Sequence, residues 1–246
     1  CTVEQDYKDA LQVCDKLNIP LRSVNFAKEY WDKVFQYFLD EYKSGKTPNP
    51  DIMCNTEIKF KEFLDYAIDL GADKIATGHY VQSQNSNNQF KLLKGKDTKK
   101  DQSYFLHSLN QDQLSKTIFP LGALTKHQVR EYAKEKGFNN FNKKDSVGIC
   151  FIGQRNFKDF LKQYLPANSG DIVTESGKSV GKHEGVMFHT IGQRRGLNIG
   201  GLDSANSKPW YVVDKNISSN ELVVAQGINH PLLYKKYITV SDIHWI

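Results

Sequence analysis

Two cysteines in the 246-residue sequence stand in segments rich in proline or glycine, where a thiol could act as a nucleophile. The first, Cys54, ends the run TPNPDIMC at residues 47–54. The two prolines in this run restrict the backbone, so we expect a stiff loop that presents Asn49, Asp51 and Cys54 just ahead of a helix. The N-terminus of that helix would favour a thiolate. A plain loop with a buried cysteine is the alternative that the local pattern leaves open.

The second cysteine, Cys150, lies in the run GICFIG at residues 148–153. The pair Lys143-Lys144 precedes it and could stabilise a thiolate. A cysteine beside apolar residues is also typical of a core, so both interpretations stay open. The four cysteines form no C-x-x-C pair and the histidines show no metal-ligand spacing. We therefore expect neither a disulfide framework nor a metal site, and a reducing, cytosolic environment.

Positive charge gathers at two places in a chain whose net charge is +5. Residues 91–100 hold five lysines and one aspartate, and residues 193–196 read QRRG. A solvated surface explains either cluster, and neutralisation of phosphates is the other common use of such runs. Because both clusters occur in one chain, we favour an RNA partner.

Apolar spacing predicts the elements that must position these groups. We expect helices at residues 7–17 (with Cys14 on the buried face), 28–42, 58–70 and 125–137, the last opened by a capping box of Thr125 and Gln128. Strand candidates are residues 21–25 and 73–77, and the second ends at Gly78-His79. Helices alternating with strands predict an α/β fold with a doubly wound parallel sheet, in which ligands bind beyond the strand ends. Gly78 and His79 therefore lie where a ligand could bind.

From residue 166 onward, short strands with turn signals predict a second, β-rich domain, with strands at 171–174, 210–214 and 221–225. Residues 238–240 begin a further strand. We thus expect a truncated α/β domain at 1–165, a small β-rich domain at 166–235 and the start of a third domain at 236–246. No apolar run approaches the roughly 18 residues of a membrane helix, and no leader pattern opens the chain, so we expect no membrane or secretory role.

Five motifs, in order along nearly the whole chain, closely resemble those of the tRNA-specific 2-thiouridylases. They are TPNPDxxCN at 47–55, ATGHY at 76–80, KDQSY at 100–104, GICFIG at 148–153 and HTxGQRxG at 189–196. The resemblance implies an ATP-pyrophosphatase-type nucleotide-binding domain, a β-rich central domain and the first strand of a C-terminal β-barrel. It also implies exchange of the C2 oxygen of the wobble uridine for sulfur in tRNAs such as those for Lys, Glu and Gln.

The resemblance also implies the chemistry. ATP and Mg²⁺ adenylate the uracil oxygen, which is a poor leaving group, and a sulfur nucleophile then displaces AMP. Cys150 receives sulfur from a sulfur-relay protein and carries it as a persulfide. Cys54 resolves this persulfide through a transient disulfide with Cys150, whether the sulfur attacks as the persulfide or as released hydrosulfide.

Further residues take roles by the same resemblance. Asp51 is a general acid/base held against a flipped-out target base, and Asn49 and Pro50 complete that contact. The residues implied to touch ATP or RNA are Gly78 for ATP and His79, Lys100, Asp101 and Gln102 for tRNA. One departure is that the S-G-G-x-D-S loop of the family does not occur in these 246 residues. We therefore expect these residues alone to bind ATP and Mg²⁺ weakly and to be inactive.

Two other functions compete with this interpretation. A non-catalytic tRNA-binding module would use the basic turns and leave both cysteines in the core. Another ATP-dependent enzyme of the same α/β superfamily would use Cys54 on a small substrate, but it would leave the two basic turns without a role.

Overall fold

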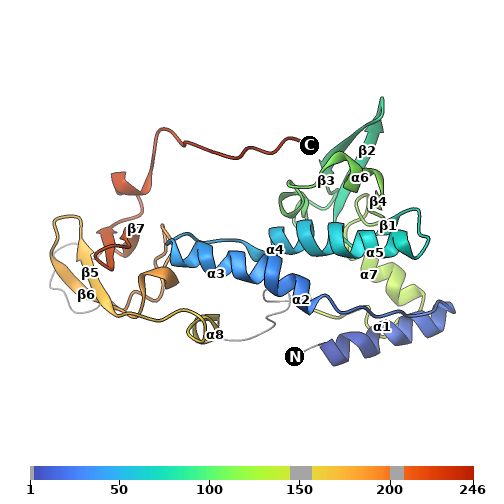
Figure 1. Ribbon diagram of the computed structural model, residues 1–246, viewed down its shortest axis with the longest axis horizontal. Helices are drawn as coiled ribbons and strands as arrows, with labels where there is room; N and C mark the ends of the chain where they lie inside the picture. The colour runs from blue at the N-terminus through green and yellow to red at the C-terminus, as the bar shows by residue number, and fades with distance from the viewer. Residues whose placement is uncertain (1–2, 145–156, 200–207) are drawn as a thin grey trace. The chain divides into compact units, whose positions relative to one another are not determined.

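The computed structural model describes residues 3–144, 157–199 and 208–246 (Figure 1). It divides into two compact units. The first comprises Cys1–Phe35, Asn49–Gln154 and Ile243–Ile246, and the second comprises Gln36–Pro48 and Arg155–Asp242. The domain boundaries expected at residues 165 and 235 stay predictions.

The first unit opens with helix α1 (Val3–Leu17). Cys14 in this helix is only half-buried, so the expectation that it lies in the core is wrong. Residues 21–25 do not form the expected strand, because no described residue pairs with them and residues 22–25 are exposed. The Oδ1 atom of Asn25 instead accepts a hydrogen bond from the backbone N–H of Ala27, 2.9 Å away, at the start of the next helix.

Two long helical runs follow. The first joins α2 (Ala27–Tyr30), the π-helical segment Trp31–Phe35 and α3 (Gln36–Lys43), which confirms the helix expected at 28–42. The second joins α4 (Pro50–Met53), the π-helical segment Cys54–Glu62 and α5 (Phe63–Asp69). Its apolar face buries Ile58, Phe60 and Leu64. The second run begins eight residues before the expected start at Ile58, which changes the setting of Cys54.

A parallel pair of short strands, β1 (Ile75–Ala76) and β4 (Thr117–Ile118), packs against the second run. The pair confirms the parallel pairing expected for the strand at 73–77. The backbone N–H of Thr77 continues the pairing to the carbonyl oxygen of Ile118, 3.1 Å away. The shared core contains Phe60, Leu64, Ile75, Val81, Leu106, Leu109, Leu114 and Phe119. Gly78 therefore follows a strand whose position the core fixes.

The antiparallel hairpin of β2 (Val81–Ser86) and β3 (Gln89–Lys94) projects from this unit in Figure 1. Its two-residue turn, Asn87-Asn88, has φ values of 53° and 62°, a left-handed conformation that asparagine tolerates. A single-turn helix (Ser103–Phe105) and α6 (Gln111–Ser115) follow.

Helix α7 (Lys126–Glu135) has the expected capping box, in which Thr125 and Gln128 bond to each other's backbone N–H groups, and Gly137 follows it with φ 68°. The loop after α7 lies against α1, where Lys16 Nζ donates to the carbonyl oxygen of Gly137 over 2.7 Å (Figure 1). Two segments more than 100 residues apart are thus joined beside α7.

The second unit contains a four-stranded sheet in the order β6-β5-β8-β7. The strands are β5 (Gly170–Thr174), β6 (Ser179–His183), β7 (Trp210–Asn216) and β8 (Glu221–Gln226). This sheet confirms the β-rich character expected after residue 166, although β6 was not predicted. Its helices are α3, already given, α8 (Phe157–Leu161) and two single turns, Val186–Phe188 and Pro231–Leu233. Residues 238–240 form no strand with any described residue and are largely exposed, contrary to expectation.

Candidate functional site

The segment that carries Cys54 is a capped helix start rather than a loop. Asn49 is extended, with φ −107° and ψ 98°, and its Oδ1 accepts a hydrogen bond from the backbone N–H of Asp51 over 3.1 Å. Pro50 occupies the first helical position, where its missing N–H costs nothing. The expected stiff loop is therefore wrong from Pro50 onward. An asparagine followed by proline is itself a helix-start signal that could have been recognised in the sequence.

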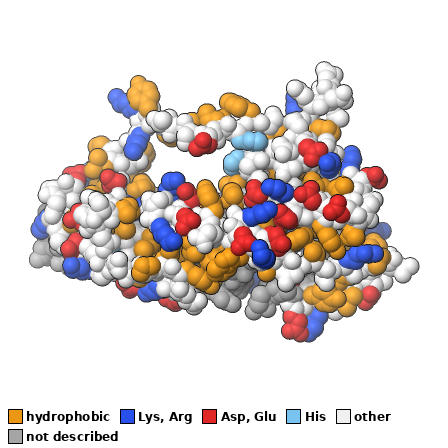
Figure 2. Space-filling view, in the orientation of Figure 1, with side chains coloured by type: hydrophobic (Ala, Val, Ile, Leu, Met, Phe, Trp, Pro, Cys, Tyr) orange, Lys and Arg blue, Asp and Glu red, His pale blue; other side chains and the backbone are white. Residues whose placement is uncertain are grey.

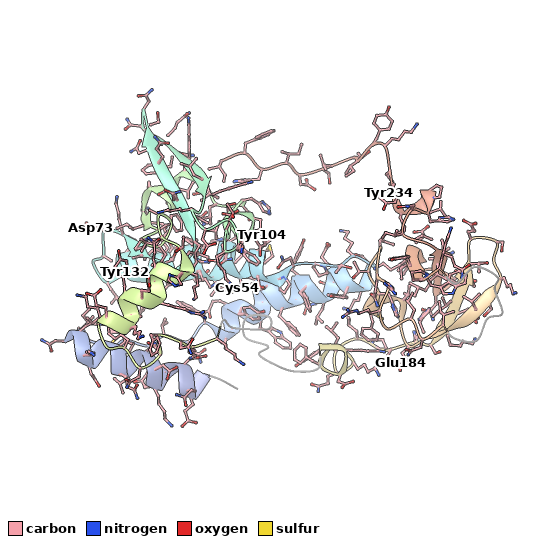
Figure 3. All side chains as sticks on the ribbon, turned by 180° about the vertical axis from the view of Figure 1, so that it is seen from behind. Cys54, Asp73, Tyr104, Tyr132, Glu184 and Tyr234 are labelled. Atoms are coloured by element: carbon pink, nitrogen blue, oxygen red, sulfur yellow. The ribbon has the colours of Figure 1, made fainter. Side chains whose placement is uncertain are left out.

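Asp51 and Cys54 lie one turn apart on this helix and hence on the same side of it. Asp51 is half-buried, whereas Cys54 is 1% exposed and begins the π-helical segment. The backbone N–H of Phe63 bonds to the carbonyl oxygen of Ile58, five residues back, at the end of that segment. Such widened turns occur often at functional sites. Figure 3 labels Cys54 on this run.

Asn55, next to Cys54, is not among the predicted site residues. Its side chain is 3% exposed, and its Oδ1 has no hydrogen-bond partner within the described parts of the chain. A buried acceptor without a donor costs free energy. The residue next to Cys54 therefore holds unused hydrogen-bonding capacity.

Cys150 lies outside the described residues, as does the whole of 145–156. Its pairing with Cys54 and its surroundings stay predictions.

His79 and Gly78 follow β1 in different environments. Gly78 is exposed, whereas His79 is 9% exposed and its Nδ1 lies 3.0 Å from Thr77 Oγ1. Burial, aided by the charge of Lys59, lowers the pKa of His79 to about 4. Its ring centroid lies 5.6 Å from that of Phe60 on the Cys54 helix. His79 is thus a neutral, packed side chain at pH 7.

The turn that follows β3 is held by the side chains of Asp101 and Gln102. Asp101 Oδ1 accepts from the backbone N–H of Gly95 over 2.9 Å, and its Oδ2 accepts from Ser103 Oγ over 2.9 Å. Burial raises the pKa of Asp101, but its hydrogen bonds outweigh this and the pKa lies below its usual value. Gln102 Oε1 accepts from the backbone N–H of Tyr80 over 2.9 Å. Both side chains therefore shape the turn.

Two glycines allow this turn to form. A Cβ at Gly95 would collide with the carbonyl group of Tyr80, and a Cβ at Gly122 would collide with that of Val81. The backbone N–H of Lys96 bonds to the carbonyl oxygen of Gly122 over 2.9 Å. Three segments thus meet at backbone-to-backbone distance, which only glycine permits at these positions.

A cavity of about 450 Å³ opens where these segments meet, and we name it the turn cavity. It brings together four predicted site residues, Gly78, Lys100, Asp101 and Gln102, with Lys99 of the lysine run and with Tyr80 and Tyr104 of the quoted motifs. Phe105 and Lys126 also line it and were not predicted. Tyr104, labelled in Figure 3, is 55% exposed and its ring centroid lies 4.1 Å from that of Phe105. Cations beside an exposed aromatic ring can bind the phosphates and bases of a nucleotide or RNA.

The basic turn at residues 193–196 belongs to the second unit. Gln193 Oε1 accepts from the backbone N–H of Thr190 over 3.0 Å, and its Nε2 donates to the carbonyl oxygen of Arg195 over 2.9 Å. Arg194 and Arg195 are exposed. Nearby His189 is buried, which lowers its pKa to about 4. Gln193 and His189 therefore support a turn that leaves both arginines accessible.

Charge on the face drawn in Figure 2 is mixed, with Lys and Arg side chains interspersed with Asp and Glu. An RNA partner must therefore be argued from particular cavities and not from the face as a whole. Within residues 3–144, 157–199 and 208–246, no cluster of three or more His, Cys, Asp or Glu side chains could hold a metal ion. None of the helices in the described residues is long and apolar enough to cross a membrane.

The chain matches two protein families. Residues 1–154 match the family described as the tRNA methyl transferase HUP domain, and residues 158–226 match the tRNA methyl transferase PRC-barrel domain. The HUP match confirms the expected α/β nucleotide-binding class with a parallel sheet.

Individual relatives match the whole chain. It is 56% identical over 246 residues to a tRNA-specific 2-thiouridylase, MnmA, of Coxiella burnetii (strain RSA 493 / Nine Mile phase I), and it covers 68% of that protein. It is 57% identical over 247 residues to the protein of the same name from Colwellia psychrerythraea, of which it covers 66%. A third, from Pseudomonas savastanoi pv. phaseolicola, is 56% identical and 65% covered. The chain thus spans about two thirds of the length of these relatives.

Proposed function

Since the chain belongs to the family of the tRNA-specific 2-thiouridylases, we propose that the full-length protein exchanges the C2 oxygen of a wobble uridine in tRNA for sulfur. The observation that carries this proposal beyond family membership is the placement of Asp51 and Cys54 one turn apart on a helix start. A carboxylate and a thiol on one side of a helix can serve proton transfer and sulfur transfer at one bound base.

Cys150 and Cys54 divide the sulfur chemistry between them. Cys150 accepts a sulfur atom from a sulfur-relay protein and holds it as a persulfide. If the terminal sulfur attacks C2, AMP leaves, Cys54 attacks the Cys150 sulfur and the bond between the two persulfide sulfurs breaks. If Cys54 attacks first, hydrosulfide leaves and then attacks C2. Both routes end with a Cys54–Cys150 disulfide, which an external thiol must reduce before the next turnover.

The thiol of Cys54 is 1% exposed, so it is shielded from competing oxidants in solution. Resolution of the persulfide brings the sulfur of Cys150 to the thiol of Cys54. We propose that tRNA binding triggers this step, because attack by Cys54 in the absence of tRNA would release the sulfur of the persulfide with no uridine to accept it.

Asp51 acts on the target base as general acid/base in this proposal. The side-chain oxygen of Asn49 is occupied in capping the helix, so its NH₂ group is the part that would contact the base. Pro50 is buried and fixes the direction in which the helix starts. A base stacked within RNA could not reach this point, so we propose that the uridine flips out.

ATP is the co-substrate that turns the uracil oxygen into a leaving group. The turn cavity fits a nucleotide, because exposed Gly78 offers backbone without a side chain and Lys99, Lys100 and Lys126 line the same space. We propose Gly78 as the ATP contact. The described residues provide no cluster of metal ligands, so our proposal assigns no side chain to Mg²⁺. Weak binding of ATP by these 246 residues alone stays a prediction.

The partners in this proposal are tRNAs for Lys, Glu and Gln and a persulfide-donating relay protein. Lys100 supplies charge from the turn, whereas Asp101 and Gln102 shape it through the hydrogen bonds described above. In this proposal His79 contributes to RNA binding only through packing, because its neutral ring carries no positive charge at pH 7.

Two competing functions predict different products. A non-catalytic tRNA-binding module would bind tRNA and leave it unmodified, and an enzyme acting on a small substrate would not need tRNA. The family description speaks of methyl transfer, but the relatives that match the whole chain are named thiouridylases. Thiolation is therefore the function we propose.

The test is digestion of tRNA to nucleosides and mass spectrometry after incubation with the full-length protein, ATP and a sulfur donor. We expect 2-thiouridine with the wild type and with Cys14→Ser, and none with Cys54→Ser or Cys150→Ser. Unmodified tRNA with the wild type, or full activity of both site variants, would overturn the proposal. A methylated nucleoside would favour the chemistry of the family description.

A further inference from the structure

A second cavity, of about 460 Å³, lies beside α7 and takes no part in the roles proposed above. We name it the α7 cavity. One face of the helix forms its wall through residues at helical spacing, and further residues come from the loop after the helix and from α1. The lining residues are Asp6, Lys126, Val129, Arg130, Ala133, Asn140, Phe141, Lys143 and Lys144.

Among the described residues, four cations and one carboxylate line the α7 cavity. Lys143 Nζ lies 2.7 Å from Asp6 Oδ1 and 2.5 Å from Asp9 Oδ2, so this lysine is neutralised and ties α1 to the loop after α7. Arg130 and Lys144 line the same wall as further cations. A concave surface with this charge attracts anions.

Arg130 is anchored in the wall of the α7 cavity. Its Nη2 donates to the carbonyl oxygen of Lys143 over 3.3 Å, which anchors the guanidinium in the wall. Its Nε is shielded from solvent and has no acceptor among the described residues. A buried donor without an acceptor costs free energy. Arg130 lines the cavity, and the fork of a guanidinium matches two oxygens of a phosphate.

Lys126 belongs to the walls of both the α7 cavity and the turn cavity. Its backbone N–H donates to Asp97 Oδ2 over 2.9 Å, and its Nζ lies 5.9 Å from the centre of the Tyr80 ring. Two cation-lined cavities that share one lysine suit a ligand with several phosphates in succession. The α7 cavity also contains the apolar residues Val129 and Phe141. A ribose could pack on these two side chains, whereas an inorganic ion would leave them uncovered.

We infer that the α7 cavity binds a phosphodiester of the RNA backbone, with Arg130 as the main donor and Lys126 and Lys144 adding charge. That this RNA is tRNA rests on the proposed function. A phosphate of a free nucleotide has the same donor requirements, so the experiment must separate the two sources.

The experiment measures the affinity of the full-length protein for unmodified tRNA over a range of KCl concentrations. Each phosphate contact that is lost lowers the slope of log affinity against log salt by about 0.9. We expect Arg130→Gln to lower the affinity for tRNA about tenfold at low salt, because one charge-assisted hydrogen bond contributes that much. The slope should fall by the amount that corresponds to one lost phosphate contact. Lys144→Gln should act in the same direction, and because Lys144 is exposed, its replacement leaves the fold intact.

The matched control is Lys134→Gln, which removes the same charge from an exposed position of α7 outside the cavity. Wild-type affinity in both Arg130→Gln and Lys144→Gln, or an equal loss in Lys134→Gln, would overturn the inference. A loss of ATP affinity with unchanged tRNA affinity would also overturn it, because the cavity would then be a free-nucleotide site. Thiolation of the bound tRNA is scored separately, so a protein that binds through the cavity but forms no 2-thiouridine contradicts the proposed function alone.

Discussion

The Cys54 helix start and the turn cavity lie in the same unit, but they are constructed in opposite ways. Residues 49–54 are contiguous, and one hydrogen bond between Asn49 and the Asp51 N–H starts the helix that aligns Asp51 with Cys54. The turn cavity joins residues from three parts of the chain between Gly78 and Lys126. Its geometry depends on close backbone contacts at Gly95 and Gly122.

In our proposal the helix start performs the chemistry and the turn cavity recognises the substrates. A site formed by one contiguous segment keeps its geometry when residues elsewhere are substituted. A site formed by distant segments keeps its geometry only when the whole unit is correctly folded. We therefore expect substitution of Asp51 at the helix start to reduce the reaction rate with little effect on stability or tRNA affinity. Substitutions at the cavity glycines should instead reduce stability and binding together.

The largest expected effect of a conservative change is that of Asp51→Asn. A general acid/base contributes about 10² to 10⁴ in rate, and the amide keeps the shape but cannot exchange the proton. We expect kcat for thiolation to fall at least about a hundredfold, with unchanged tRNA affinity, in single-turnover assays. Asp65→Asn, an exposed acid on the same helical run, is the control. Equal rates for Asp51→Asn and wild type would remove Asp51 from the chemistry.

His79 links the two regions through its ring contact with Phe60, and its effect depends on pH. Because burial lowers its pKa from 6.5 to about 4, the unfolded chain binds the proton more tightly than the folded one. Stability from this group is therefore complete above pH 6.5 and is lost as the pH falls toward 4, by up to about 3 kcal/mol. Urea unfolding of His79→Asn at several pH values should show a shallower acid dependence than the wild type. Parallel curves for the two proteins would contradict the buried, neutral state.

Gly122→Ala sharpens the comparison at the cavity. The added methyl group meets the carbonyl of Val81, so we expect a loss of about 2 kcal/mol in the free energy of unfolding and weaker tRNA binding. Gly78→Ala is the matched control, since the nearest atom to its Cβ, Leu121 Cδ1, is 3.9 Å away. That variant should keep its stability and lose ATP affinity. A stable Gly122→Ala protein with normal tRNA affinity would show that the close approach is dispensable.

The smallest expected effect concerns Asn49. Loss of the helix cap in Asn49→Ala should cost about 1 kcal/mol, measured by urea unfolding. Asn49→Asp keeps a capping oxygen but removes the NH₂ group, so its stability should stay near that of the wild type while thiolation slows. If both variants thiolate at the wild-type rate, Asn49 is only a cap and makes no contact with the base.

The same contrast explains which features were predictable from the sequence. Helix α7 was predicted with its capping box because Thr125, Gln128 and Gly137 act locally. The start at Pro50 differs from the prediction because two close prolines favour a loop, whereas Asn49-Pro50 also satisfies the rules for a helix start. The strand at 21–25 failed because a strand needs a partner that no local pattern supplies.

The turn cavity and the α7 cavity could not be predicted from the sequence. The lysine run at 91–100 indicated an RNA surface, but the inclusion of Lys126 depends on its hydrogen bond to Asp97 across 29 residues. The role of Arg130 depends on a loop and a helix that only the folded unit brings together. Long-range backbone approach, unlike capping, leaves no periodic signal in the sequence.

The most direct test of the central claim is peptide mapping of the full-length protein under non-reducing conditions, after one turnover with tRNA, ATP and a sulfur donor. We predict a cross-linked peptide pair that contains Cys54 and Cys150 in the wild type. In Cys54→Ser the pair should be missing, and Cys150 should retain the additional sulfur atom, either as the persulfide or still bonded to C2 of the tRNA uridine. Wild-type protein that forms 2-thiouridine while no Cys150 persulfide and no Cys54–Cys150 cross-link can be trapped would contradict the account.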